Sequence, residues 1–343
     1  MSYNIKDIAR ICGVSVSTVS KILNNKADNI SEATKKMILK RVKELNYIPN
    51  ETARSMVTKK SRIIAFVIPD ISNPYFPEIA RGIGDLLIEK GFHLLIYNTG
   101  GNLQVENQII DYIKQFNVQG VIFSTQNCFE ENEKIGELYE TSNISVVLIE
   151  RNIKKYPNLP GIYVDNEKGS YDATKFLISK GHKKIAVVTG PLSIANIKYR
   201  FYGFQKAMEE AGLMIDHKLI IESDFTTYGG EKAVNHLLES YSDNKFTALF
   251  AFNDLMAWGA VTAIKKKAII IPDDIAVIGF DGILISEAMN PALSTVSTPM
   301  YLIGNSASNK ILEQIESKNN LLNQAFIQNK LIIPPRLIIR DST

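Results

Sequence analysis

The sequence predicts a small all-helical domain followed by a larger α/β region of two doubly wound parallel-sheet lobes. Residues 5–25 contain two stretches of helical apolar spacing joined by a short turn. From residue 63 onward, continuous apolar runs alternate with segments of helix length, a pattern typical of parallel sheets covered on both faces. Residues 1–60 hold nine Lys and three Arg against two Asp and three Glu, a net charge of +7 in a chain whose total is +3. The basic part and the α/β part should therefore have different partners.

The first two predicted helices lie within residues 5–23. The apolar stripe of the first helix comprises Ile5, Ile8, Ala9 and Cys12. Asn4 is placed to cap this helix and Gly13 to end it. Ser15 can cap the second helix, and Val14 and Val19 have the spacing of a hydrophobic staple across that cap. A tight turn should therefore join the two helices.

The second helix has an exposed face of short, hydrogen-bonding side chains that ends in a cation. This face comprises Val16, Ser17, Ser20 and Lys21. Short side chains let a helix backbone approach DNA closely, and Ser or Lys can meet base edges or phosphates in the major groove. The same spacing suits an ordinary two-helix hairpin, and by itself it does not decide between the two.

A third helix should begin at the cap Ser31. Its buried stripe would comprise Ile38, Val42 and Leu45. Its lysines form a solvated face that can add non-specific attraction to DNA. Pro49 then breaks the helix, and Asn50 can cap a further one of about two turns. A helix that short persists only when it packs against a partner.

The composition is that of a soluble globular protein long enough for two or three domains, with 343 residues, 45% of them hydrophobic and 22% charged. Cys12 and Cys128 lie far apart, without a CxxC pattern or a Cys/His cluster, so we expect reduced thiols, no metal site and no cofactor. The first residues form no apolar export signal, and no stretch is long enough to span a membrane. We therefore expect a cytoplasmic protein.

The apolar runs of the α/β region should be its buried strands. They are IIAFVIP, HLLIY, GVIF, VVLI, IYV, KIAVVT, ALFAF and IAVIGF. Gly91, Gly181 and Gly212 stand where glycines commonly end the intervening helices. These units are too many for one small sheet, so a pair of lobes is expected.

The chain resembles the lactose-repressor (LacI) family of bacterial transcription regulators over essentially its full length. The resemblance rests on eight stretches in order, among them IKDIARICGVSVSTVSKILNN, IAFVIPDISNPYFPEIARGI, YRFYGFQKAM and IAVIGFDGI. It implies a helix-turn-helix domain, a hinge helix, and a periplasmic-binding-protein-like core that holds a small effector and forms a homodimer. Some members carry a tetramerising heptad tail, which this sequence lacks, so a dimer is expected.

The resemblance also implies domain boundaries. They are a helix-turn-helix DNA-binding domain at residues 1–48, a hinge helix and linker at 49–61, and a core at 62–343. The core would divide into an N-lobe of residues 62–162 and 294–324 and a C-lobe of residues 163–293 and 325–343. The chain would then cross between the lobes three times, near residues 162, 293 and 324.

In similar proteins the recognition helix reads the major groove through the positions of Val16, Ser17 and Lys21. Further DNA contacts are implied at Ser15, Thr18, Ser20, Asn24, Ser31 and Tyr47 and, in the hinge, at Asn50, Ala53 and Met56. The expected partner is a pseudo-palindromic operator in double-stranded DNA. Many members have Arg in place of Lys21, and a lysine lacks the bidentate fork, so base discrimination there should be softer.

Met56 matches the leucine that relatives use as a wedge. Two hinge helices of a dimer can enter the minor groove together and push an apolar side chain between base pairs. Methionine is apolar and flexible, so Met56 can still insert. The alternative is that Met56 is an ordinary linker residue.

Polar residues follow several predicted strands, and ligands of open α/β sheets bind outside the carboxyl ends of the strands. The candidate effector-binding residues are Tyr75, Phe76, Ser124, Glu150, Arg151, Arg200, Phe225, Asn253 and Asp281. Carboxylates and amides can bind hydroxyl groups while aromatic faces cover the C–H side of a ring, so the expected effector is a sugar or sugar derivative. The resemblance points above all to Phe76, Arg200, Asn253 and Asp281.

Some of these assignments have alternatives. Asp281 could merely cap the next helix, Arg200 could be a surface cation, and Ser124 is equally consistent with either role. Lys198 stands where many relatives have Arg, and Gly282 where Asp or Asn is frequent, so the identity of the effector stays open. The expected coupling between effector and DNA is about 1–3 kcal/mol, and inducers and corepressors both occur on this scaffold.

Two other classes of protein are disfavoured. An enzyme would need a reactive constellation, but no G-x-S-x-G, P-loop or G-x-G-x-x-G pattern occurs, and the histidines lack metal-ligand spacing. A sugar-binding protein of a transport system would share the core fold but would need an export signal and has no use for residues 1–60. The sequence therefore predicts a DNA-binding repressor that is not an enzyme.

Overall fold

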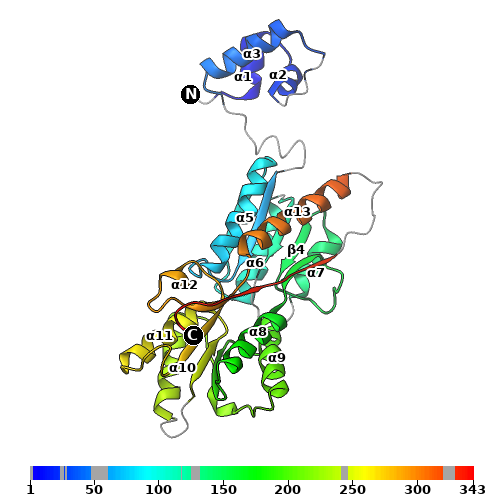
Figure 1. Ribbon diagram of the computed structural model, residues 1–343. Helices are drawn as coiled ribbons and strands as arrows, with labels where there is room; N and C mark the ends of the chain where they lie inside the picture. Colours follow the sequence, from blue (N-terminus) through cyan, green and yellow to red (C-terminus); the bar gives the residue numbers. More distant parts are fainter. Residues whose placement is uncertain are drawn as a thin grey trace. The chain divides into compact units, whose positions relative to one another are not determined.

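The computed structural model describes residues 3–23, 27, 29–47, 61–116, 118–124, 132–240, 246–319 and 329–343. The chain divides into two compact units, residues 1–61 and 62–343 (Figure 1). Six residues discussed above lie outside the described part: Asn24, Pro49, Asn50, Ala53, Met56 and Cys128. The predicted hinge helix also falls there, apart from residue 61.

The described part of the N-terminal unit contains three helices, α1 (Ile5–Cys12), α2 (Val16–Leu23) and α3 (Glu32–Glu44). Their predicted caps are confirmed. The Asn4 side chain accepts hydrogen bonds from the first turn of α1, and Ser31 Oγ accepts one from the backbone N–H of Thr34. Gly13 ends α1 with a φ of 64°, a left-handed conformation that suits glycine. The short α1–α2 connection is therefore encoded locally.

One fully buried side chain from each helix forms the centre of this unit: Ile8, Val19 and Ile38. Each isolated helix would be marginal at this length, so the shared apolar cluster is what holds the three together. The predicted helix-turn-helix is confirmed.

The first lobe of the core contains a six-stranded parallel sheet in the order β11-β5-β4-β3-β1-β2. Its strands are β1 (Ile63–Ile68), β2 (His93–Asn98), β3 (Gly120–Phe123), β4 (Ser145–Ile149), β5 (Gly161–Val164) and β11 (Lys330–Ile333). Its helices are α5 (Tyr75–Glu89), α6 (Leu103–Gln115), α7 (Glu133–Thr141) and α13 (Met300–Asn319).

Both faces of this sheet are covered, which explains the continuous apolar runs. In β1, Ile64 and Phe66 pack into the cluster that contains residues of α5 and α13. Their neighbours Ala65 and Val67 pack into the cluster that contains residues of α6 and α7. Successive side chains of a strand point to opposite faces, so every residue of β1 after the first is buried.

The second lobe contains a six-stranded sheet in the order β12-β10-β9-β8-β6-β7, in which only β12 is antiparallel to its neighbour. The strands are β6 (Ile185–Thr189), β7 (Ile220–Glu222), β8 (Ala248–Ala251), β9 (Ala276–Asp281), β10 (Ser294–Ser297) and β12 (Arg336–Ile338). The helices are α8 (Asn166–Ser179), α9 (Ala195–Glu210), α10 (Thr227–Ser240), α11 (Asp254–Lys266) and α12 (Ile285–Ala288), with a short 3-10 turn at His217–Leu219. The predicted fold class is confirmed.

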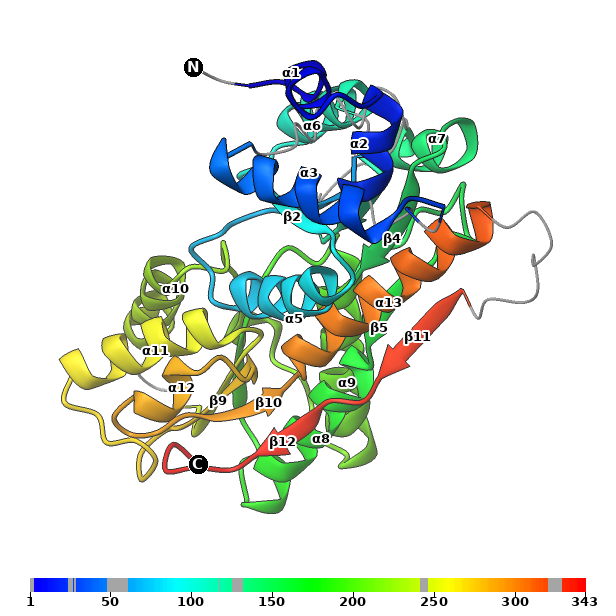
Figure 2. The same ribbon diagram turned by 90° about the horizontal axis from the view of Figure 1, so that it is seen from above.

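Three segments connect the lobes. The first crosses after Val164, at the end of β5 and close to the predicted residue 162. The second and third cross later than predicted, after Ser297 and Ile333 instead of near residues 293 and 324. Residues 294–297 pair with β9 and belong to the C-lobe sheet, whereas residues 330–333 pair with β5 and belong to the N-lobe sheet. Figure 2 shows β11 and β12 as one extended segment running from one lobe into the other.

Three positive-φ glycines end helices as predicted. Gly91, Gly181 and Gly212 have φ values of 72°, 94° and 66° and follow α5, α8 and α9. Among the described residues, no helix combines the length and hydropathy needed to cross a membrane.

Candidate functional site

The outward face of α2 is built as the sequence indicates. Val19 and Ile22 are buried against the other helices, while Val16, Ser17 and Lys21 are exposed. Val16 keeps 39% of its surface exposed, whereas the other described valines of the unit, Val14, Val19 and Val42, are more covered. An apolar residue beside a hydroxyl and an ammonium group offers contacts to a thymine methyl, a base edge and a phosphate.

The start of α2 is held by a small hydroxyl cluster. Ser15 Oγ accepts the backbone N–H of Thr18 at 3.1 Å and lies 2.7 Å from Ser17 Oγ and 2.8 Å from Thr18 Oγ1. These hydroxyls fix the first turn of the helix, where DNA phosphates are commonly bound. Tyr47, in contrast, packs into the apolar cluster, where burial raises the pKa of its phenol.

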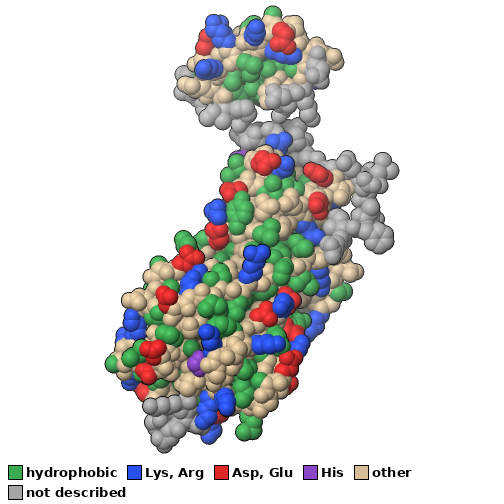
Figure 3. All heavy atoms as spheres, viewed as in Figure 1, with side chains coloured by type: hydrophobic (Ala, Val, Ile, Leu, Met, Phe, Trp, Pro, Cys, Tyr) green, Lys and Arg blue, Asp and Glu red, His purple; other side chains and the backbone are tan. Residues whose placement is uncertain are grey.

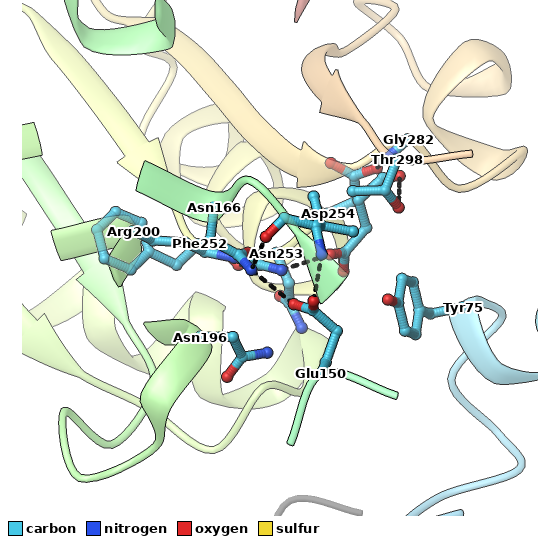
Figure 4. A network of polar contacts seen from close by, with 12 residues as sticks. Tyr75, Glu150, Asn166, Asn196, Arg200, Phe252, Asn253, Asp254, Gly282 and Thr298 are labelled. Carbon is cyan, nitrogen blue, oxygen red and sulfur yellow. Dashed lines mark hydrogen bonds and ion pairs between the residues drawn. The ribbon is translucent and has the colours of Figure 1, made fainter. Parts of the chain in front are cut away.

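In the core, eight of the nine candidate effector residues line one cavity between the lobes, here called the cleft cavity. They are Tyr75, Phe76, Ser124, Glu150, Arg200, Phe225, Asn253 and Asp281. The first four come from the N-lobe and the last four from the C-lobe, each at or just beyond the carboxyl end of a strand or on the helix that follows it. Figure 4 shows Tyr75 of α5 facing Glu150 and the polar residues of the C-lobe.

Arg200 on α9 is the centre of this polar network. Its Nε donates to Asn166 Oδ1 at 2.9 Å, its Nη1 donates to the carbonyl oxygen of Phe252, and its Nη2 lies 3.3 Å from Asp281 Oδ1. The guanidinium also stacks 3.6 Å from the centroid of the Phe280 ring. Arg200 is thus a buried, oriented group and not the surface cation that the sequence left open.

Two carboxyl groups of the C-lobe are shifted towards their neutral forms. Burial raises the pKa of Asp281 to about 6, against the opposing effect of Arg200. Burial, followed by the charge of Asp281, raises the pKa of Asp254 to about 8. Asp254 accepts hydrogen bonds from Thr295 Oγ1 at 2.6 Å and from the backbone N–H groups of Gly282 and Ile283 at 2.8 and 2.9 Å. Asp254 therefore supports the loop after Asp281.

Gly282 departs from the residue types frequent in relatives, and its geometry gives a reason. Its φ is 76°, and a Cβ at this position would lie 2.7 Å from Ser297 Cα. A side chain here would require both a strained backbone and a shift of β10. The second carboxylate or amide found in relatives thus has no room in this chain.

Glu150 joins the N-lobe to the first crossing segment. Its Oε1 accepts the backbone N–H of Val164 at 2.5 Å, and its Oε2 accepts Asn166 Nδ2 at 2.6 Å. Burial raises the pKa of this carboxyl, partly opposed by these two hydrogen bonds. Because Asn166 also bonds Arg200, a single chain of polar contacts runs from Glu150 to Asp281 (Figure 4).

Asn253 and Phe225 support each other at the C-lobe wall. Asn253 caps α11 by accepting the N–H of Met256 at 2.8 Å, and its Nδ2 donates to the Phe225 carbonyl oxygen at 2.9 Å. The Phe225 ring covers Gly190, where any Cβ would overlap it. On the opposite wall, Tyr75 and Phe76 form an edge-to-face pair with ring centroids 5.2 Å apart.

Backbone strain gathers at this cavity. Glu150, Phe225 and Asp281 have φ values of 54°, 68° and 115°, which non-glycine residues rarely adopt. Strained conformations of this kind persist only where the surrounding structure holds them in place, and they are common at ligand-binding sites. With this backbone conformation the Asp281 side chain contacts Arg200. Asp281 is therefore not merely a helix cap, which was the alternative left open by the sequence.

Arg151 does not line the cleft cavity. Its guanidinium forms two bonds to Glu106 inside the N-lobe, from Nη1 to Oε2 at 3.0 Å and from Nη2 to Oε1 at 3.2 Å. The left-handed backbone at Glu150 and the position of Glu106 direct the Arg151 side chain into the N-lobe and away from the cavity. The assignment of Arg151 to the effector site was wrong for this reason.

Several cavity residues escaped the sequence analysis: Asn73, Ile149, Asn196 and Ile197. Two of them could have been predicted from Arg200. Asn196 and Ile197 lie four and three residues before it and therefore share its face of α9. Asn73 sits in the NPYF turn beside Tyr75 and Phe76. Nothing in the sequence marks Asn166, which links Glu150 to Arg200.

The cleft cavity is nearly closed in this conformation. Its volume is about 30 Å³, which is room for one or two water molecules and not for a sugar ring. A larger ligand requires the two lobes to separate. Among the described residues, no group of His, Cys, Asp and Glu side chains is arranged to hold a metal ion.

Comparisons with known proteins match both units. Residues 4–50 match the family model described as bacterial regulatory proteins, lacI family, and residues 61–337 match periplasmic binding proteins and sugar binding domain of LacI family. The HTH-type transcriptional regulator DegA of Bacillus subtilis is 34% identical, over 100% of this chain and 98% of the relative. The ribose operon repressor of Halalkalibacterium halodurans is 33% identical, over 99% and 96%.

A solved structure shows the same fold. The lac repressor dimer bound to operator and the anti-inducer ONPF superimposes with a TM-score of 0.87 at 22% identity, covering 100% of this chain and 99% of the other. The full-length relatives are named as transcriptional regulators and repressors. The chain therefore belongs to the LacI family of bacterial transcriptional regulators.

Proposed function

We propose that this protein is a repressor whose affinity for an operator is set by an uncharged sugar or sugar derivative bound in the cleft cavity. The observation that carries the proposal is the convergence of eight predicted residues from both lobes on one cavity, in a chain that also carries a helix-turn-helix. A regulator of this kind works on DNA in the cytoplasm.

The charges of the cavity support an uncharged ligand. Glu150 and Asp281 face it with carboxyl groups, and Arg200, the one cation among the described residues that line it, is already bonded to Asp281, Asn166 and Phe252. A phosphate would meet two carboxylates without a free cation to balance it. Hydroxyl groups can instead donate to the carboxylates while Phe76 and Phe225 cover an apolar ring face.

On the DNA side we propose that α2 enters the major groove. Val16, Ser17 and Lys21 would meet base edges, and Ser15, Thr18, Ser20 and Ser31 would contact the phosphates or groove edges. Tyr47 can contribute only its hydroxyl group, because its ring is packed inside. The hinge residues Asn50, Ala53 and Met56, together with Asn24, complete the proposed contact set.

We propose that the working form is a homodimer on a pseudo-palindromic operator. The core carries large apolar side chains at its surface, and the face drawn in Figure 3 shows several hydrophobic patches between charged groups. Leu95 and Ile96 lie exposed on the edge strand β2, and Leu284 beside α12 is 82% exposed. Exposed apolar surface of this kind is typical of protein interfaces.

The sugar would act by favouring one relative arrangement of the lobes. Residues of both lobes line the cavity, so a ligand that touches both walls binds one arrangement more tightly. The expected change in DNA affinity corresponds to about 1–3 kcal/mol. Operator affinity measured with and without the sugar gives the sign of the effect.

The first experiment is a thermal-shift screen of the full chain with neutral sugars and the corresponding sugar phosphates. A ligand that binds only the folded state raises the melting temperature. Neutral sugars should produce shifts that disappear in the Asp281→Asn variant. If only phosphorylated sugars stabilise the protein, the proposal about the effector is wrong.

The second experiment selects an operator from a pool of random duplexes with the full chain. The selected sequence should be a pseudo-palindrome, and its affinity should fall steeply with salt because Lys and Arg contacts release counterions. A chain of residues 62–343 should keep sugar binding and lose DNA binding. Selection of a single half-site, or a flat salt dependence, would contradict the proposal.

A further inference from the structure

A second and larger cavity lies beside the cleft cavity, and the proposed function does not use it. It has a volume of about 350 Å³ and is lined from the N-lobe by β5 and β11 and from the C-lobe by the start of α9. The two cavities share only Glu150 and Asn196. We call it the β11 cavity. Its volume falls within the range of about 300–1,000 Å³ found for small-molecule sites, whereas that of the cleft cavity does not.

The N-lobe wall of the β11 cavity holds an aromatic platform. Gly161 and Tyr163 lie two residues apart on β5 and share one face of the sheet. The Tyr163 ring lies across Gly161, since a Cβ there would come within 2.6 Å of its Cε2 atom. The phenol donates to the Arg151 carbonyl oxygen at 2.8 Å, which fixes the ring in place. The strand thus covers one face of this ring.

The C-lobe wall presents a second tyrosine. Tyr199 lies in the second turn of α9 and is 47% exposed. Asn196, one turn earlier, also lines the cavity, and Asn152 lines it from the N-lobe. Two aromatic rings from opposite lobes and two amides that line the same cavity suit a flat ring that carries hydrogen-bonding groups.

The charges at this cavity define the ligand further. Glu150, Asp165 and Glu167 contribute three carboxyl groups, of which Glu167 is paired with Lys206 at 3.8 Å, and Lys330 is the one cation among the described lining residues. The Lys330 ammonium lies 3.3 Å from Asn152 Oδ1 and 5.7 Å from the Tyr163 ring centroid. A negatively charged ligand is therefore repelled on balance, while hydroxyl groups find acceptors in the carboxylates.

We propose that the β11 cavity is a second small-molecule site, for a ring compound that carries hydroxyl groups and no negative charge, such as a nucleoside or an aryl glycoside. The ligand would lie between the rings of Tyr163 and Tyr199. Because each ring belongs to a different lobe, occupancy stabilises the arrangement of the lobes in which the cleft cavity is nearly closed. The site would thus add a second input to the control of DNA binding.

Isothermal titration of the full chain with adenosine and with 4-nitrophenyl β-glucoside tests this proposal, and adenosine 5′-monophosphate serves as the anionic control. At least one uncharged probe should bind, and the monophosphate should bind more weakly than adenosine. Loss of an aromatic stacking partner costs about 1–3 kcal/mol, so Tyr199→Ala should weaken binding about tenfold or more. Tyr112→Ala on α6 is the control, because Tyr112 is 53% exposed and does not line the cavity.

A second variant tests the platform itself. Gly161→Ala introduces a Cβ that displaces the Tyr163 ring, and it should weaken binding of the same probe while thermal unfolding reports whether the sheet remains intact. The proposal is overturned if neither uncharged probe binds at millimolar concentration, or if the monophosphate binds as tightly as adenosine. It is also overturned if Phe225→Ala, and not Tyr199→Ala, removes binding, because the probe then lies in the cleft cavity. Binding of the glucoside that Phe225→Ala removes would support the proposed sugar site in the cleft cavity, whereas failure of both probes to bind would leave the sugar screen to test that site separately.

Discussion

The core contains two buried arginine–carboxylate pairs that differ in how completely they are bonded. Arg151 and Glu106 form two bonds within one lobe, and Asn132 Nδ2 adds a third to Glu106 at 2.7 Å. Arg200 and Asp281 make a single contact of 3.3 Å at the cavity between the lobes, where burial raises the pKa of Asp281 to about 6. Burial and pairing are common to both. The two pairs differ in their carboxyl groups. Glu106 accepts several hydrogen bonds inside the lobe, whereas Asp281 makes one contact to Arg200 and can accept further hydrogen bonds from a ligand.

The largest effect should follow from breaking the complete pair. Glu106→Gln leaves the buried Arg151 charge without its counter-ion and should lower the free energy of unfolding by about 3–5 kcal/mol. Urea denaturation of the core measures this loss. The double variant Glu106→Leu with Arg151→Met removes both charges and should recover most of it. If the single variant is as stable as the parent, the pair is not the structural element described here.

The second effect is a dependence of stability on pH that comes from the incomplete pair and its neighbour. Asp281 and Asp254 have folded-state pKa values of about 6 and about 8, above the value of about 4 for an unfolded aspartate. The folded state therefore binds protons more tightly, and stability is greatest when both groups are protonated. It should fall as pH rises through these values, by up to about 1.4 kcal/mol per pH unit for each group.

Urea denaturation over a series of pH values measures this slope. Asp254→Asn should flatten the fall between about pH 6 and pH 8, where the folded state keeps the Asp254 proton that the unfolded state has lost. Glu106→Leu with Arg151→Met should leave the slope as it is. A stability that rises with pH over the same range would contradict the assignment.

The third effect should separate binding from stability. Asp281→Asn removes a charged hydrogen-bond acceptor from the cleft cavity, so affinity for the stabilising sugar should fall about 10–100-fold. Arg200 keeps its bonds to Asn166 and the Phe252 carbonyl, so the loss of unfolding free energy should be smaller than for Glu106→Gln. Calorimetric titration gives the first quantity and urea denaturation the second. Unchanged sugar affinity would remove Asp281 from the binding site.

The smallest effect concerns the third bond of the complete pair. Asn132→Ala removes the donor to Glu106 Oε1 together with the side-chain cap of α7, and each loss should cost about 1 kcal/mol of unfolding free energy. Sugar affinity should not change, because Asn132 does not line the cleft cavity. If sugar affinity changes and stability does not, the Arg151–Glu106 pair contributes to ligand binding, and its assignment as the structural pair is wrong.

Features that depend on neighbours in the chain could be predicted from the sequence. The caps Asn4 and Ser31 and the glycine that ends α1 act within one helical turn, and their residue types are sufficient signals. The buried strands were recognisable because both faces of each sheet are covered. The second and third crossings between the lobes could not be predicted in this way. They follow β10 and β11, which are four-residue strands that pair with strands far away in the sequence.

The candidate site shows the same limit. Phe225, Asn253 and Asp281 directly follow strands or precede helices, so their place at the cavity follows from the fold class. Arg151 was misplaced because the left-handed backbone at Glu150 and the position of Glu106 decide which of two adjacent side chains faces the cavity. Neither is visible in a local sequence pattern.

The order of the strands along the chain also affects how the protein is made. Strands β11 and β12 follow all the others described and supply an edge to each sheet, and Ser342 then bonds the Val277 backbone of β9. Neither lobe can finish folding on the ribosome until β11 has emerged, and the C-lobe needs the chain at least as far as Ser342. Products that end before β11 would leave β5 and β10, which are interior strands of the finished sheets, as unpaired edges, a state prone to aggregation and proteolysis. Such truncated products should therefore be degraded sooner than chains in which both sheets are finished.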